Sequence, residues 1–163
     1  MPARQGFTLV EAMIASSILA ATVTAVTLPF TAGAQNEQDS ARLTLAVALA
    51  GELMEEILSK PFDDPTGVQT PGPEAGETSR SLYTNVDDYH NYSEADGQIK
   101  DAYGSSCTDP LAKGLSRVAT TEYVYLSGQS TAQSPSVIRV TVAVKYNTRA
   151  VSTLQRLVYK YGG

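Results

Sequence analysis

The sequence has 163 residues, of which 18% are charged, with a formal net charge of −5 and one cysteine. This length suits one modest domain beside any membrane segment. The acidic balance argues against a general nucleic-acid-binding protein. A single cysteine excludes an intrachain disulfide, and with it a disulfide scaffold or a cysteine-based zinc site. Cys107 is interpreted as an incidental free thiol.

An apolar run extends from Phe7 to Gly33 and contains one charge, Glu11. About 20 apolar residues suffice for a helix to span a bilayer. A carboxylate at this depth costs roughly 2.5–3.5 kcal/mol, so Glu11 is expected to need a partner. The run can be a cleaved signal peptide ending at Ala34 or a plain membrane anchor. However, it is too long for a signal peptide, and neither interpretation gives Glu11 a role.

A third interpretation accounts for both features. The sequence GFTLVEAMIA, from Gly6 to Ala15, resembles the processing motif of type IV prepilins and type II secretion pseudopilins. In that family the leader ends in glycine, phenylalanine follows, and a glutamate stands five residues after the cut. The resemblance implies that a prepilin peptidase cleaves after Gly6 and that Phe7 is N-methylated. Residues 1–6 are then the leader and residues 7–33 the transmembrane and assembly helix.

The resemblance also assigns an assembly role to Glu11, which would pair with the Phe7 amine of a neighbouring subunit. Pro29 lies inside the expected helix and predicts a helix kink there, because proline removes one backbone hydrogen bond. The alternative is that the membrane helix ends near Pro29 and a separate helix follows.

Residues 34–61 are expected to form an amphipathic helix. Its predicted apolar face consists of residues at helical spacing, namely Leu43, Val47, Ala50, Met54 and Ile57, and is widened by Leu49, Leu53 and Leu58. The segment ELMEEILSKPFDDP, Glu52 to Pro65, resembles a group of minor pilins, the D proteins of mannose-sensitive haemagglutinin (MSHA) type pili. The segment NVDDYHNY, Asn85 to Tyr92, resembles a loop of the same group.

Residues 62–114 are predicted to be an acidic variable loop region. Residues 63–114 hold ten acidic and three basic residues, and the region is rich in glycine and proline. A short strand is expected near Arg80–Tyr83. The favoured interpretation of the acids around His90 is a solvated, hydrogen-bonded loop without a metal. Calcium is the alternative, with Asp87, Asp88 and Asp96 as candidate ligands, although their spacing does not match an EF-hand.

Residues 115–163 are predicted to form an antiparallel β-sheet and carry a net charge of +5. The expected strands are 115–126, 137–146 and 153–161, with a hairpin loop at Asn147–Arg149. The clean alternation from Ile138 to Tyr146 predicts one buried face. The fold class is therefore α+β and resembles that of type IV pilins. A long amino-terminal helix packs on a carboxyl-terminal sheet of three to four strands.

The sequence predicts a structural filament subunit, a minor pilin or pseudopilin, rather than an enzyme, and no cofactor. The expected partners are a prepilin peptidase, other pilin or pseudopilin subunits, an inner-membrane assembly platform and the lipid bilayer; no nucleic acid is expected. The expected location is the bacterial inner membrane, with a single span and the carboxyl-terminal head outside the cytoplasm, and then a pilus or pseudopilus. The alternative is a membrane-tethered binding protein that does not polymerise and presents a basic sheet to DNA or a surface ligand.

Overall fold

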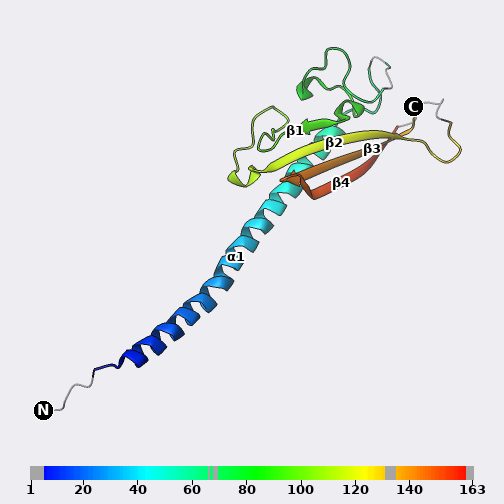
Figure 1. Ribbon diagram of the computed structural model, residues 1–163. Coiled ribbons are helices and arrows are strands. Elements are labelled where there is room, and N and C mark those ends of the chain that lie inside the picture. The colour runs from blue at the N-terminus through cyan, green and yellow to red at the C-terminus, as the bar shows by residue number, and fades with distance from the viewer. Residues whose placement is uncertain (1–5, 66, 68–69, 131–134, 161–163) are drawn as a thin grey trace. The chain divides into compact units, whose positions relative to one another are not determined.

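The computed structural model describes residues 6–65, 67, 70–130 and 135–160. The chain divides into two compact units, Met1–Ser40 and Ala41–Gly163, which are considered separately below. Within the described residues, the elements are one α-helix, α1, four β-strands and three short 3-10 helices, η1 to η3 (Figure 1). These elements confirm the predicted α+β class.

Helix α1 runs from Leu9 to Leu58 and contributes to both units. Pro29 lies inside it, and the helix is continuous through this residue. The sequence alternative of two separate helices is therefore wrong. A kink at Pro29 stays a prediction.

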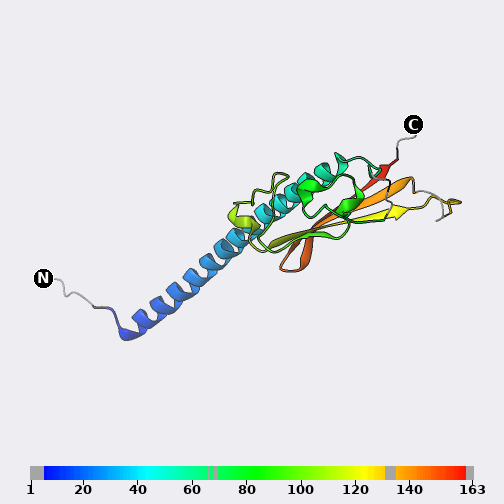
Figure 2. The same cartoon turned by 90° about the horizontal axis from the view of Figure 1, so that it is seen from above.

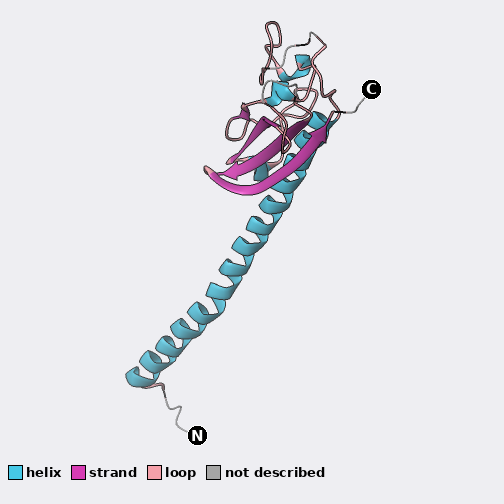
Figure 3. Cartoon of the chain, turned by 90° about the vertical axis from the view of Figure 1, so that its right-hand side faces the viewer, coloured by secondary structure: helices cyan, strands magenta, loops and turns pink. Residues whose placement is uncertain are grey.

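The sheet in the second unit is an antiparallel meander with strand order β1-β2-β3-β4. Strand β1 spans Tyr92–Glu94, β2 spans Leu115–Val124, β3 spans Val137–Tyr146 and β4 spans Arg149–Tyr159. The three long strands form one layer against the part of α1 that belongs to this unit (Figures 2 and 3). Strand β1 adds a fourth strand from within the region predicted to be loop.

The last strand begins earlier than expected, at Arg149 instead of residue 153. The reason is a tight connection: Asn147 and Thr148 both have positive φ angles, 47° and 72°. Two consecutive residues with positive φ form a two-residue turn whose twist matches that of the flanking strands. Strand pairing therefore resumes at Arg149, directly after the turn. The register between β3 and β4 then shifts near Val144, and a β-bulge absorbs the extra residue.

The core lies between α1 and the inner face of the sheet. The predicted alternation of β3 is confirmed, since Ile138, Val140, Val142 and Val144 are fully buried. The buried face of α1 agrees with the prediction from Leu49 to Ile57 and differs from it before Leu49. It consists of Ala46, Leu49, Ala50, Leu53, Met54 and Ile57. Leu43 and Val47, which were assigned to this face, are about half exposed. At this end of the face, Ala46 is buried in place of Val47.

The segment between the helix and the long strands is more ordered and more buried than predicted. It contains η1 at Arg80–Leu82, η2 at Asp87–Tyr89 and η3 at Pro110–Ala112. The short strand predicted near Arg80–Tyr83 is therefore wrong. Asp87, Asp88 and Glu94 are almost fully buried, which also contradicts the prediction of a solvated acidic loop.

Candidate functional site

The predicted cleavage position lies just before the first turn of α1. Gly6, Phe7 and Thr8 are not helical, and Gly6 and Phe7 are exposed. A Cβ atom added at Gly6 would meet no atom within 4 Å. The fold therefore gives no steric reason for glycine at this position, unlike at Gly114, where the added atom would clash with Tyr146.

Glu11 has a partner inside its own chain. Its Oε2 accepts hydrogen bonds from the Thr8 amide (2.9 Å) and from the Thr8 hydroxyl (2.8 Å), and the Glu11 amide donates back to Thr8 Oγ1 (3.2 Å). This reciprocal arrangement is a capping box at the amino terminus of α1. Sequence reasoning missed Thr8, although the pattern Thr-x-x-Glu before an apolar run is its signature. In the single chain, Thr8 therefore provides a partner for Glu11, and the pairing of Glu11 with a neighbouring subunit stays a prediction.

The first part of α1 has the features of a helix in an apolar medium. A window within α1 is long and apolar enough to cross a membrane, and its side chains are exposed. All six hydroxyl residues between Leu9 and Gly33 donate to a backbone carbonyl one turn earlier. They are Ser16, Ser17, Thr22, Thr24, Thr27 and Thr31. Such bonds satisfy polar groups internally, which a lipid environment requires.

The second unit is fastened by a buried ion network. Arg117, fully buried on β2, donates to Glu94 Oε2 (2.6 Å) and to the carbonyls of Leu49 (2.8 Å) and Lys100 (2.6 Å). Arg80 pairs with Glu94 and with Glu56 of α1. The network therefore links α1, the loop region and β2 through ion pairs in which glutamate and arginine alternate.

Three tyrosines pack beside this network. The rings of Tyr83, Tyr89 and Tyr92 meet edge to face, with centroids 5.0–6.1 Å apart. Burial would raise the pKa of Glu56, but hydrogen bonds from Arg80 and Tyr89 outweigh it and lower that pKa. Burial and the bond to Glu56 raise the pKa of Tyr89. These groups hold fixed charge states near neutral pH and are suited to a structural role.

The predicted calcium ligands do not come together. Asp87 accepts a hydrogen bond from the Tyr123 hydroxyl, whereas Asp96 lies exposed in a turn. Nδ1 of His90 contacts the Thr121 carbonyl at 2.6 Å. Among the described residues, the acidic side chains that do converge are Glu74, Glu77 and Asp88.

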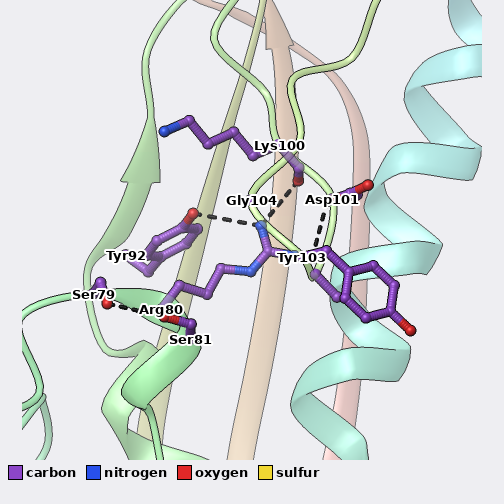
Figure 4. Close-up of a pocket in the computed structure, with 9 residues that line it drawn as sticks. Ser79, Arg80, Ser81, Tyr92, Lys100, Asp101, Tyr103 and Gly104 are labelled. Atoms are coloured by element: carbon purple, nitrogen blue, oxygen red, sulfur yellow. Dashed lines mark hydrogen bonds between the residues drawn. The ribbon is translucent and has the colours of Figure 1, made fainter.

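A cleft of about 210 Å³ opens beside η1. Figure 4 shows the Tyr92 hydroxyl and the Lys100 carbonyl directed at the Arg80 guanidinium, with Tyr103 nearby. Arg80 already donates to Glu56 and Glu94, so its guanidinium is committed to the ion network. The cleft therefore offers no uncommitted guanidinium to an anionic ligand.

Comparison with known proteins adds one match. Residues 1–27 match the family model described as the prokaryotic N-terminal methylation motif. A search of the curated proteins and a search of the solved structures gave no match.

The long helix on an antiparallel sheet is consistent with a type IV pilin fold, and the match at residues 1–27 supports a type IV pilin-like precursor. The motif is that of precursors processed by prepilin peptidase, and it implies assembly with other pilin subunits. With the apolar first part of α1, it fits a membrane-anchored pilin. The proteins that carry this motif are structural pilin-type subunits rather than enzymes. The finer resemblance to the MSHA-type minor pilins stays a prediction.

Proposed function

We propose that this chain is a structural subunit, a minor pilin or pseudopilin, of a type IV pilus or a type II secretion pseudopilus. The observation that carries the proposal is the methylation motif at residues 1–27, placed at the start of an exposed apolar helix. Cleavage falls between Gly6 and Phe7, and Phe7 becomes the N-methylated amino terminus. The exposure of both residues and the absence of a fold-based reason for Gly6 support recognition by an enzyme.

The proposed partners follow from this role. They are the prepilin peptidase, other pilin or pseudopilin subunits, an inner-membrane assembly platform and the lipid bilayer. The subunit waits in the inner membrane with its carboxyl-terminal head outside the cytoplasm. The assignment as a minor pilin rests on the two MSHA-type segments, of which Glu52–Pro65 contains the end of α1 and Asn85–Tyr92 contains η2.

In the proposed assembly, Glu11 exchanges one partner for another. In the single chain its carboxylate is held by Thr8. After cleavage, the new Phe7 amine of a neighbouring subunit supplies a full positive charge. Since a buried acid and a buried amine each carry a large desolvation penalty alone, pairing compensates both and fixes the register of adjacent helices.

Two substitutions separate the capping role of Glu11 from its charge. Glu11→Gln keeps a hydrogen-bond acceptor at the capping position and removes the charge, because glutamine also serves in capping boxes. Thr8→Val removes the hydroxyl of the cap and keeps the charge. We expect Glu11→Gln to be processed and then to fail in filament incorporation, whereas Thr8→Val is incorporated.

The assay is mass analysis of the mature amino terminus together with quantification of the subunit in sheared filaments. A methylated Phe7 is expected for the wild-type chain and for both variants. A mature terminus at Gln35 would refute processing after Gly6. Normal incorporation of Glu11→Gln would refute the charge-pairing role and leave the processing proposal intact.

The alternative is a membrane-tethered binding protein that does not polymerise and presents its basic sheet to DNA or a surface ligand. The observation in its favour is the presence of exposed or partly exposed cations on β3 and β4: Arg139, Lys145, Arg149 and Arg156. The same fractionation tests it, since such a protein would be processed and stay in the membrane. A subunit recovered in sheared filaments excludes it.

A further inference from the structure

Three carboxylates converge in the loop region of the second unit. Glu74, Glu77 and Asp88 each offer one oxygen, and these oxygens all lie within 4.8 Å of one another. Asp88 is fully buried, and both glutamates are partly buried. Like charges at this distance repel strongly outside bulk water, so the arrangement needs a compensating group.

Backbone amides hold two of the three side chains, those of Asp88 and Glu77, in position. Asp88 Oδ2 accepts hydrogen bonds from the amides of Thr84 (2.6 Å) and Asn85 (3.0 Å). Glu77 Oε2 accepts from the Glu74 amide at 3.1 Å, and the Glu77 amide donates to the Glu74 carbonyl at 3.0 Å. The carboxylates of Asp88 and Glu77 are therefore preorganised by turns, and the turn at Glu74–Glu77 places the Glu74 backbone beside them.

A separate observation points to a ligand. Asp88 is 0% exposed, and its Oδ1 has no hydrogen-bond partner in the described part of the chain. Both carboxylate oxygens of Glu74 are also inaccessible, and while this carboxylate is ionised they have no donor in the described part of the chain. Buried polar atoms are nearly always satisfied, so three unsatisfied acceptors in one cluster indicate a missing donor or cation.

Three described cations of the second unit have other partners. The Lys60 ammonium group donates to the Tyr83 carbonyl at 2.6 Å, and the Lys160 ammonium group pairs with Asp63 at 2.7 Å. Arg80 is held by Glu56 and Glu94. None of these contacts neutralises the cluster.

We propose that Glu74, Glu77 and Asp88 form a calcium site that ties the loop around residues 74–77 to η2. Oxygen-only ligands favour a hard cation over zinc, which prefers nitrogen and sulfur. Calcium fits better than magnesium, because calcium accepts six to eight oxygens in flexible geometry and the partly exposed glutamates leave room for water. The site differs from the predicted set, with which it shares only Asp88.

Protonation is the competing way to relieve the repulsion. Burial, hydrogen bonding to Glu77 and the charges of Asp88 and Asp64 raise the pKa of Glu74 to about 8. Near neutral pH the metal-free cluster therefore holds a proton on Glu74. A proton and a cation are therefore alternatives at this cluster, and a calcium-dependent shift in the melting temperature distinguishes them.

The test uses the full chain in detergent micelles, stripped with a chelator at pH 7.5. Calcium binding is measured by calorimetry and by terbium luminescence. Terbium replaces calcium and is excited through a nearby tyrosine. Tyr83 is suited to this purpose, because it directly precedes Thr84, whose amide donates to Asp88 Oδ2. Thermal unfolding with calcium, magnesium or chelator gives a third readout.

We expect calcium to raise the melting temperature more than magnesium does. Glu74→Gln and Asp88→Asn should each weaken calcium binding by about tenfold or more, as each removes one of the charged ligands. Asp96→Asn is the matched control, because Asp96 is an exposed acid in the same region and should leave binding unchanged. The proposal is overturned by absence of a calcium-dependent shift in the wild-type chain. Equal losses in the Asp96→Asn control would also overturn it.

Discussion

Replacing Arg117 by methionine tests whether the buried ion network stabilises the second unit. Arg117 is fully buried and its guanidinium contacts Glu94, Leu49 and Lys100. Removing one partner of a buried ion pair typically destabilises a protein by about 3–5 kcal/mol. Methionine retains an apolar stem of similar length, so the change removes the charge and its hydrogen bonds with little loss of packing.

The contacts that remain place the expected loss at the low end of this range. The Leu49 carbonyl lies inside α1 and keeps its helical hydrogen bond, and the Lys100 carbonyl still accepts from Arg80 at 2.9 Å. Glu94 Oε1 also keeps its contact with Arg80. Only Glu94 Oε2 loses its donor, so we expect Arg117→Met to lower the free energy of unfolding by about 3 kcal/mol.

The assay is urea unfolding of the full chain in detergent, followed by near-ultraviolet circular dichroism. The chain has nine tyrosines and no tryptophan, and the packed tyrosines beside the network dominate this signal. Arg139→Met is the matched control. Arg139 also lies on a strand and pairs with a glutamate, Glu122, but its side chain is 41% exposed. Arg139→Met should lower the free energy of unfolding by only about 0–1 kcal/mol. Equal effects of the two substitutions would refute the reasoning.

Two further outcomes follow from the second unit. Gly114→Ala should destabilise the fold by about 1–3 kcal/mol, because φ is +86° and the added Cβ would lie 2.5 Å from Tyr146 Cε2. Gly97 has a similar φ of +66°, but an added Cβ there would meet open space. Gly97→Ala should therefore lower the urea midpoint less than Gly114→Ala does, and the difference measures the contact with Tyr146. In chelator, the melting temperature should fall as pH rises from about 4.5 to about 8, because the raised pKa of Glu74 favours folding only while the carboxyl is protonated. Glu74→Gln should flatten that slope, and an unchanged slope would contradict the assignment to Glu74.

The parts of the fold that could be predicted from the sequence depend on local patterns. The continuous apolar run of α1 and the strict alternation of β3 are each visible in one window, and both elements were placed correctly. The processing motif is also local, which explains why the match at residues 1–27 agrees with it. Strand β2 is harder to interpret, because its inward positions include Arg117 and Thr121.

The buried acids could not be predicted, because their burial depends on partners distant in the chain. Glu94 is buried against Arg117, 23 residues away, and Glu56 against Arg80, 24 residues away. Composition shows ten acids in a loop-like region and cannot show which of them face arginines. An acid-rich segment was therefore interpreted as solvated, although it provides much of the internal electrostatics of the second unit.

The geometry of Glu11 refines the proposed assembly. An acid without a partner would penalise every subunit waiting in the membrane, whereas the Thr8 cap lowers that penalty within the single chain. The free energy gained on assembly is then only the difference between two interactions of the Glu11 carboxylate, that with the neighbour's amine and that with the Thr8 cap. We therefore propose that strengthening or weakening the cap changes the stability of the waiting subunit, while the charge of Glu11 controls incorporation.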